Sequence, residues 1–153
     1  MIFLSTFQNR IDKKGRISVP AQFRAALARQ VQDSDFQGII AYQSPRNECI
    51  EACGMSRMLK INAQIEQMEQ YSQERDAFLT VLFGESVQLS FDGEGRVMLP
   101  EQLLEVANLK ENATFVGKGE VFEIWQPEAF KDYAKRNRAL VQEKRFMIKG
   151  QAS

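Results

Sequence analysis

The sequence predicts an α+β fold in which two copies of one small unit share a single core. Three observations predict it: an internal repeat over most of the chain, alternating stretches typical of β-strands, and helix-like stretches between them. The repeat is clearest in the element D-x-x-G-R-x-x-x-P. It occupies Asp12–Pro20 and recurs eighty residues later at Asp92–Pro100.

The first copy begins with a strand, a turn, a second strand and a helix. Residues 3–11 are rich in aromatic and β-branched side chains and alternate in polarity, which predicts a strand. A tight hairpin turn is expected at Lys13–Gly15, because glycine tolerates positive φ and Asp12 can accept backbone N–H groups. Residues 16–19 continue as a strand, and Pro20 suits the first turn of a helix. The apolar face of that helix carries Phe23, Ala26 and Leu27.

The middle of the chain predicts two more strands and a long helical stretch. The apolar run at residues 38–42 and the stretch at 49–53 are typical of buried strands. From Ser56 onward, apolar residues recur every three or four positions, which predicts helices. The pattern breaks around Tyr71–Ser72, so we expect two helices and not one.

The same order of elements then starts again. The second copy predicts strands at 87–91, 96–99, 113–116 and 121–125, and helices from Pro100 and Pro127. Glu51 and Glu123 occupy matching positions in the two copies. A unit of this size cannot bury its own apolar faces, so the copies, residues 1–81 and 82–153, must pack on each other. We expect one compact unit with pseudo-two-fold symmetry and a small barrel-like core.

Charge is balanced over the chain but not along it. Twenty basic residues match twenty acidic ones. Residues 8–29 carry six positive charges against one negative, a local balance of +5, whereas residues 88–110 carry two against four, a balance of −2. Residues 131–149 again reach +5, with seven against two. The first copy is therefore basic and the second is not.

The composition argues against an enzyme. The chain has no histidine, and neither a nucleophile with an adjacent base nor a phosphate-cradling glycine loop is recognisable. We expect no catalytic residue, no metal and no cofactor. Cys49 and Cys53 are expected to be small buried hydrophobic residues and not a disulfide or a metal site. With no targeting or membrane segment in view, we expect a cytoplasmic protein.

Two interpretations apply to the repeated turn. In the structural one, the aspartate satisfies backbone donors and the arginine four residues on pairs with it; the residues assigned to this motif are Asp12, Gly15, Asp92, Gly95 and Arg96. In the functional one, the first turn presents Lys13, Lys14 and Arg16 to DNA phosphates and base edges. For Arg16 both interpretations stay open. Arg10, on the preceding strand, and Arg24, on the exposed face of the following helix, would flank this surface, although each alone is also an ordinary solvated charge.

The duplicated element, together with Phe122-Glu123-Ile124-Trp125, resembles the MraZ family, and the resemblance spans residues 3–140. It implies a fold related to the AbrB and SpoVT proteins: a small double-split, swapped-hairpin β-barrel made from two fused repeats with flanking helices. It also implies a ring-shaped homo-oligomer. The resemblance further implies a nucleoid-associated regulator of transcription that binds short direct repeats in double-stranded DNA upstream of the division and cell wall gene cluster.

Two features leave alternatives open. The second turn carries Gly93-Glu94 where the first carries Lys13-Lys14, which argues against two equivalent DNA-contacting copies. The basic C-terminal stretch, residues 131–149, could reach the DNA backbone or a neighbouring subunit, or could simply be a solvated helix face. The alternative function is a non-catalytic protein-interaction or scaffold module.

Overall fold

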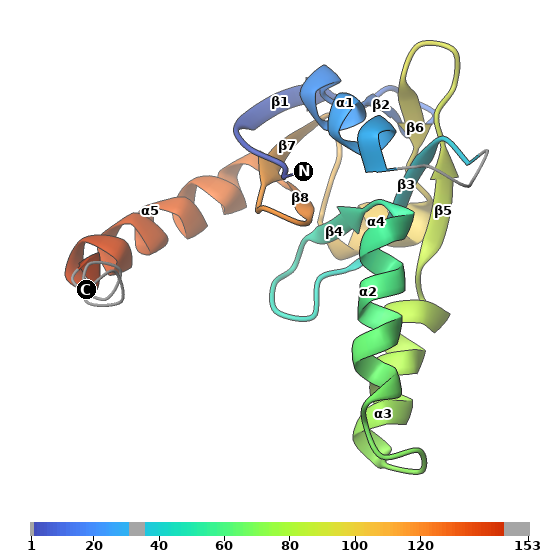
Figure 1. Cartoon of the computed structure of the whole chain (residues 1–153). Helices are drawn as coiled ribbons and strands as arrows, with labels where there is room; N and C mark the ends of the chain where they lie inside the picture. The colour runs from blue at the N-terminus through green and yellow to red at the C-terminus, as the bar shows by residue number, and fades with distance from the viewer. Residues whose placement is uncertain (1, 31–35, 146–153) are drawn as a thin grey trace.

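The computed structural model describes residues 2–30 and 36–145 and confirms the α+β class (Figure 1). Its elements are β1 (Thr6–Arg10), β2 (Arg16–Ser18), α1 (Ala21–Gln30), β3 (Gly38–Gln43), β4 (Ile50–Cys53), α2 (Met55–Glu66), α3 (Gln73–Phe78), the π-helix η1 (Leu79–Gly84), β5 (Val87–Ser90), β6 (Arg96–Met98), α4 (Glu101–Val106), β7 (Asn112–Gly117), β8 (Phe122–Trp125) and α5 (Pro127–Glu143). The end of the basic stretch, residues 146–149, lies outside the described residues.

The strands form a six-stranded antiparallel sheet and a separate two-stranded ladder. The order in the large sheet is β1-β7-β8-β4-β3-β5, and the ladder pairs β2 with β6. The strand order of the large sheet is symmetric. Exchanging each strand for its counterpart in the other half of the chain gives the same order read from the other edge. At the centre of this sheet Glu51, which occupies the matching position in the other copy, pairs directly with Glu123. In the ladder Ile17 pairs with Val97 in the same way.

The strands on either side of each turn do not form a hairpin with each other. Asp12 N donates to Arg16 O at 3.0 Å and closes the first turn, but β1 then pairs with β7 while β2 pairs with β6. This exchange of partners agrees with the swapped-hairpin arrangement that the family resemblance implies. The exchange of partners lets Ile17 and Val97, each 1% exposed, reach a common core. The described strands do not close into one barrel, but the arrangement is compatible with a split barrel.

Alternation along the strands sends side chains to two cores, one on each face of the sheet. Ile39 and Ala41 join the larger core, which also contains apolar residues of β2, β6, α1 and α4. Ile40 and Tyr42 point to the other face and pack against α2 and η1. Trp125 contributes to a third, smaller cluster under the start of α5. The β2–β6 ladder and the helices α2 and α5 thus contribute to different cores.

Two helical segments extend from this body in different directions (Figure 1). One, which we call the arm, consists of α2, α3 and η1; Ser72 Oγ accepts from Arg75 N at 3.1 Å and starts α3, so the predicted break is confirmed. The other is α5, whose end lies far from the body. None of the described helices has both the length and the apolar character needed to cross a bilayer.

Candidate nucleic-acid interface

The first turn is held by one carboxylate. Asp12 Oδ1 accepts from the backbone N–H groups of Lys14 and Arg16, both at 2.9 Å, and Oδ2 accepts from Arg16 Nε at 2.6 Å. The backbone hydrogen bond from Arg16 is the main reason that the pKa of Asp12 lies below its ordinary value. Gly15 adopts φ 83°, a conformation that favours glycine. The structure thus shows the turn geometry that the repeated element predicts.

The second turn repeats this geometry. Asp92 Oδ1 accepts from Glu94 N at 2.8 Å and Arg96 N at 3.0 Å, while Oδ2 accepts from Arg96 Nε at 2.8 Å. The pKa of Asp92 is again lowered, first by the backbone N–H of Arg96, and the pKa of Arg96 is raised by its hydrogen bond to Asp92. Gly95 has φ 75°. Only this turn adds an acidic partner, since Glu94 Oε2 lies 3.6 Å from Arg96 Nη2.

The two turns are tied to each other through the ladder. Leu99 N donates to Gly15 O at 2.9 Å, and Val19 N donates to Gly95 O at 3.2 Å. A side chain at Gly15 would approach Leu99 O to 3.0 Å. The carbonyl of each turn glycine therefore accepts a hydrogen bond from the end of the ladder strand of the other copy. Neither turn is positioned independently.

One solvent-facing surface results, which we call the ladder face: Arg16, Ser18, Arg96 and Met98. Arg16 pairs with Met98 and Ser18 pairs with Arg96, so these four side chains share the face opposite to the buried Ile17–Val97 pair. Met98 is 54% exposed. The two arginines thus lie diagonally on one surface, which the sequence did not reveal.

The other basic residues predicted to contact DNA divide between the two turns. Lys13 and Lys14 are exposed at the tip of the first turn, and Arg10 is exposed on the edge strand β1 that leads into it. Arg24 lies elsewhere. Its Nε donates to Val19 O at 3.0 Å, and its guanidinium covers the second turn, where a Cβ on Gly95 would come within 2.7 Å of it.

This placement corrects the expectation that Arg24 flanks the first turn on an exposed helix face. The side chain is half-buried, because the exchange of strands carries α1 across to the second turn. The counterpart of Arg24 is Leu104, which lies 3.6 Å from a Cβ built on Gly15. The first copy therefore supplies a cation to the acidic second turn, and the second copy supplies an apolar side chain to the basic first turn.

Sequence reasoning missed Ser18 and Met98 as surface neighbours of the arginines. Ser18 is also fixed from behind, since Asn9 Nδ2 donates to its carbonyl at 2.7 Å. The repeat spacing gives this face only once the antiparallel pairing of β2 with β6 is known. Two identical elements that pair antiparallel about Ile17 and Val97 must place Arg16, Ser18, Arg96 and Met98 on one face.

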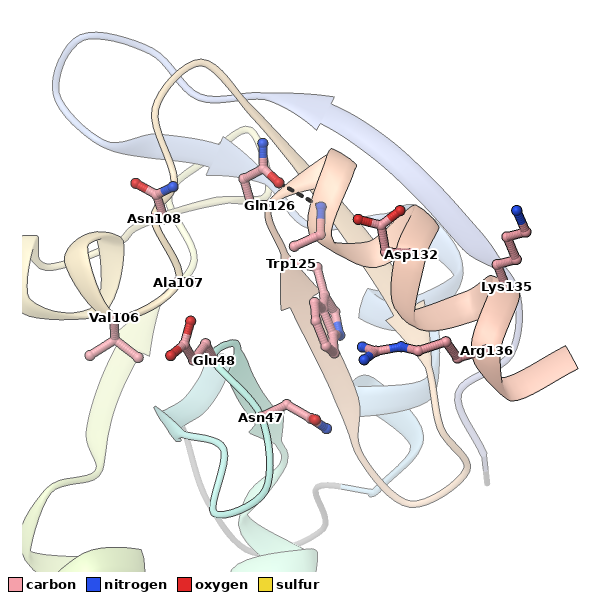
Figure 2. Close-up of a pocket in the computed structure, with 11 residues that line it drawn as sticks. Asn47, Glu48, Val106, Ala107, Asn108, Trp125, Gln126, Asp132, Lys135 and Arg136 are labelled. Carbon is pink, nitrogen blue, oxygen red and sulfur yellow. Dashed lines mark hydrogen bonds between the residues drawn. The ribbon is translucent and has the colours of Figure 1, made fainter. Parts of the chain in front are cut away.

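A second concave region lies beside Trp125 (Figure 2). It has a volume of about 630 Å³, and Figure 2 shows Arg136 reaching toward Trp125 from α5, with Glu48 on the β3–β4 loop at the other side. No serine, cysteine or threonine is among its lining residues. Its charged side chains are of both signs, with Lys135 and Arg136 beside Glu48 and Asp132, so it is not a cationic surface and the ladder face stays the candidate site.

The two cysteines are buried and free, as predicted. Both side chains are 0% exposed. Burial raises the pKa of Cys49 and of Cys53 to about 12 each, which keeps them as neutral thiols at physiological pH. They act as small core residues.

Comparison with known proteins identifies the family. A family model described as "MraZ protein, putative antitoxin-like" matches residues 2–78 and 82–149. The chain is 56% identical over 149 residues to a transcriptional regulator MraZ of Rickettsia bellii (strain OSU 85-389), covering 97% of each chain. It is 51% identical over 148 residues to the proteins of that name from Rickettsia akari (strain Hartford) and Rickettsia felis (strain ATCC VR-1525 / URRWXCal2), again covering 97% of each. These names describe a regulatory role, which confirms the prediction that the chain is not an enzyme. The chain belongs to the MraZ family.

Proposed function

We propose that the chain regulates transcription by binding double-stranded DNA through the first turn and the ladder face. The relatives' names support a role in transcription. The observation that carries the DNA-binding part is the exposed cation group of Lys13, Lys14 and Arg16 on a turn fixed at both ends by hydrogen bonds. We further propose that residues 1–81 and 82–153 are two fused copies of one unit.

The lysines and the arginine of the first turn have different proposed roles in DNA binding. Lys13 and Lys14 are long exposed cations at a turn tip, suited to phosphate contacts that give affinity without sequence preference. Arg16 is held more firmly, because Asp12 binds its Nε at 2.6 Å. The bond to Nε leaves the terminal nitrogens of the guanidinium for a base edge or a phosphate. A two-stranded ribbon of this kind can enter the major groove.

The second turn contributes less in this proposal. Arg96 is shared between Asp92 and Glu94, and Glu94 stands where the first turn has Lys14. An acidic tip repels the phosphate backbone. One turn per subunit then makes the main contact, and several subunits must act together for tight binding.

We propose that this multiplicity comes from a ring-shaped homo-oligomer bound to short direct repeats. The repeats would lie upstream of the protein's own operon in the division and cell wall gene cluster, and the protein would act in the cytoplasm at the nucleoid. Subunits arranged head to tail present their turns by rotation and translation, which suits direct repeats better than a palindrome.

The test is a mobility-shift assay with the DNA upstream of the gene, over a salt series. Lys14→Ala and Arg16→Ala should each lower affinity at least ten-fold, and Lys14→Ala should reduce the salt dependence by about one counterion for each contacting turn. The control is Lys60→Ala, which removes another exposed cation, one that pairs with Glu120 at 3.1 Å, from α2 on the opposite side of the sheet.

Two outcomes would reject the proposal. Both turn variants could bind as tightly as the parent protein, or Lys60→Ala could weaken binding as much as they do. The alternative of a non-catalytic scaffold predicts no difference between the parent protein and the turn variants, because none of them forms a salt-dependent DNA complex.

A further inference from the structure

We propose that α5 of one copy docks on the distal arm of a second copy, so that the chain assembles head to tail. The distal arm is defined here as residues 64–85. This contact deepens the proposed homo-oligomer, on which it rests, and does not depend on DNA binding. It also assigns a role to the basic C-terminal helix, for which the sequence left DNA and a neighbouring subunit as alternatives.

The first observation is an apolar stripe on α5 that continues past the body. Tyr133 stacks on Trp125 with ring centroids 4.5 Å apart, and Phe130 packs beside them at 6.0 Å from Trp125. The same helical spacing leads on to Leu140 and Val141. These two side chains are 52% and 61% exposed. The C-terminal end of α5, in which they lie, extends away from the sheet (Figure 1). The outer half of the stripe is therefore unpartnered within the described chain.

The second observation is the charge of α5 around this stripe. Residues 131–144 carry five positive charges against two negative ones, a balance of +3. Of the five, only Lys131 forms an ion pair within the described residues, with Glu128 at 3.6 Å. Lys135, Arg138 and Lys144 are exposed. The helix thus presents apolar side chains flanked by free cations.

The distal arm has the complementary composition. Its five carboxylates stand against one cation, Arg75, which gives a balance of −4. All five are exposed, and none forms an ion pair with another residue that the structure describes; they are Glu66, Glu69, Glu74, Asp76 and Glu85. Large apolar side chains lie among them, since Tyr71 is 89% exposed and Phe78 is 47% exposed.

A groove beside these residues could receive the end of the stripe. It has a volume of about 510 Å³ and runs from the arm to the sheet. Its walls include the apolar Ile61, Ile65, Met68, Phe78 and Leu82, and also charged side chains of both signs: Arg46, Arg57 and Lys118 with Glu51 and Glu120. Two aliphatic side chains of the size of Leu140 and Val141 fit a hollow of this volume. Glu74 lies one helical turn before Phe78 on α3, where it can meet the cations of an incoming α5, and Tyr71 immediately precedes Ser72, the N-cap of that helix.

The two surfaces cannot meet within one copy. In Figure 1 the arm and α5 leave the body in different directions, and their ends lie far apart. Each copy therefore offers one α5 and one arm to different neighbours, which is a heterologous contact that continues from copy to copy. Both ends also lie away from β2 and β6, so the contact leaves the ladder face open.

The test uses two variants whose changes are confined to exposed side chains. The α5 variant is Arg138→Glu with Leu140→Ser, and the arm variant is Glu74→Lys with Tyr71→Ser. The matched controls are Arg29→Glu on α1 and Glu101→Lys on α4, which make the same charge changes elsewhere. The readouts are mass by light scattering and sedimentation, without DNA, and circular dichroism to verify the fold.

Each variant alone should have the mass of a monomer, while both controls keep the mass of the parent assembly. An equal mixture of the two variants should form 1:1 dimers, because one retains an intact arm and the other an intact α5. Variants that keep the parent mass, or a mixture that stays monomeric, would overturn the contact while leaving an oligomer possible. A parent protein that is monomeric at all concentrations would overturn both the contact and the proposed oligomer, and would leave the DNA-binding test unaffected.

Discussion

At the scale of single residues, the turn is decided by one glycine and one carboxylate. Gly15 has φ 83° and packs against the chain of the other copy, where a Cβ would meet Leu99 O at 3.0 Å. An alanine at this position is unfavourable for two reasons. The left-handed backbone conformation disfavours a side chain, and the Cβ would lie close to the carbonyl of Leu99, which cannot move without disturbing the β2–β6 ladder. Asp12 then fills the backbone donors of the turn.

We therefore expect Gly15→Ala to lower the free energy of unfolding by about 1–3 kcal/mol. Gly93→Ala is the matched control, because its φ is not positive and a Cβ there meets no atom within 4 Å. It should change stability by less than about 0.5 kcal/mol. Urea unfolding of the three proteins measures the difference. Equal losses in both variants would show that the conformation of Gly15 does not limit stability.

At the scale of elements, the two turns share hydrogen bonds but differ in charge. Each aspartate accepts the same three donors, so the common pattern explains folding and not recognition. The difference lies at the tips, where Lys14 corresponds to Glu94, and at the flanking helices, where Arg24 corresponds to Leu104. Charge at the tip, and not the repeated motif, therefore predicts which turn meets DNA.

Glu94→Lys tests this explanation. The substitution makes the second tip resemble the first and frees Arg96 from its second acidic partner. We expect DNA affinity to rise several-fold at low salt, with a steeper salt dependence, because a repulsive charge becomes an attractive one on the same surface. Fluorescence anisotropy over a salt series measures it, with Glu101→Lys on α4 as the control. An equal gain from both variants would mean that total charge alone matters.

At the scale of the whole molecule, each half takes part of its strand pairing from the other, although β3 pairs with β4 and β7 with β8 within one half. β1 of the first half pairs with β7 of the second, and β5 of the second half pairs with β3 of the first. The larger core is shared in the same way. Phe23 contacts Phe122 with ring centroids 4.8 Å apart, and Phe3 contacts Phe122 at 5.0 Å. The halves therefore stabilise each other through shared strand pairs and a shared core.

The fragments 1–81 and 82–153 should accordingly lack cooperative unfolding when each is studied alone as a monomer. When mixed, they should form a 1:1 complex that regains it, because the missing strand partners and core residues are then supplied. Circular dichroism during thermal unfolding, with the mass of each sample determined, measures both. Cooperative unfolding of fragment 1–81 as a monomer would contradict the shared core.

The order of the elements, the two turns and the two buried cysteines follow from the sequence, because they depend on local chemistry. Turn residues, prolines at helix starts and hydrophobic spacing act over a few neighbours. The break at Tyr71–Ser72 was predictable for this reason, and the repeat predicted that Glu51 and Glu123 occupy matching positions. Local charge likewise identified the first turn as the basic one.

Only the tertiary structure decided which strands pair, where Arg24 lies and which residues share the ladder face. These depend on contacts between residues about eighty positions apart, and a local pattern is compatible with either a hairpin or an exchange of strands. Burial of Ile17 against Val97 favours the exchange, and the exchange carries α1 to the opposite turn. The repeated element thus determined that two turns form. Their common core determined that they act as one surface.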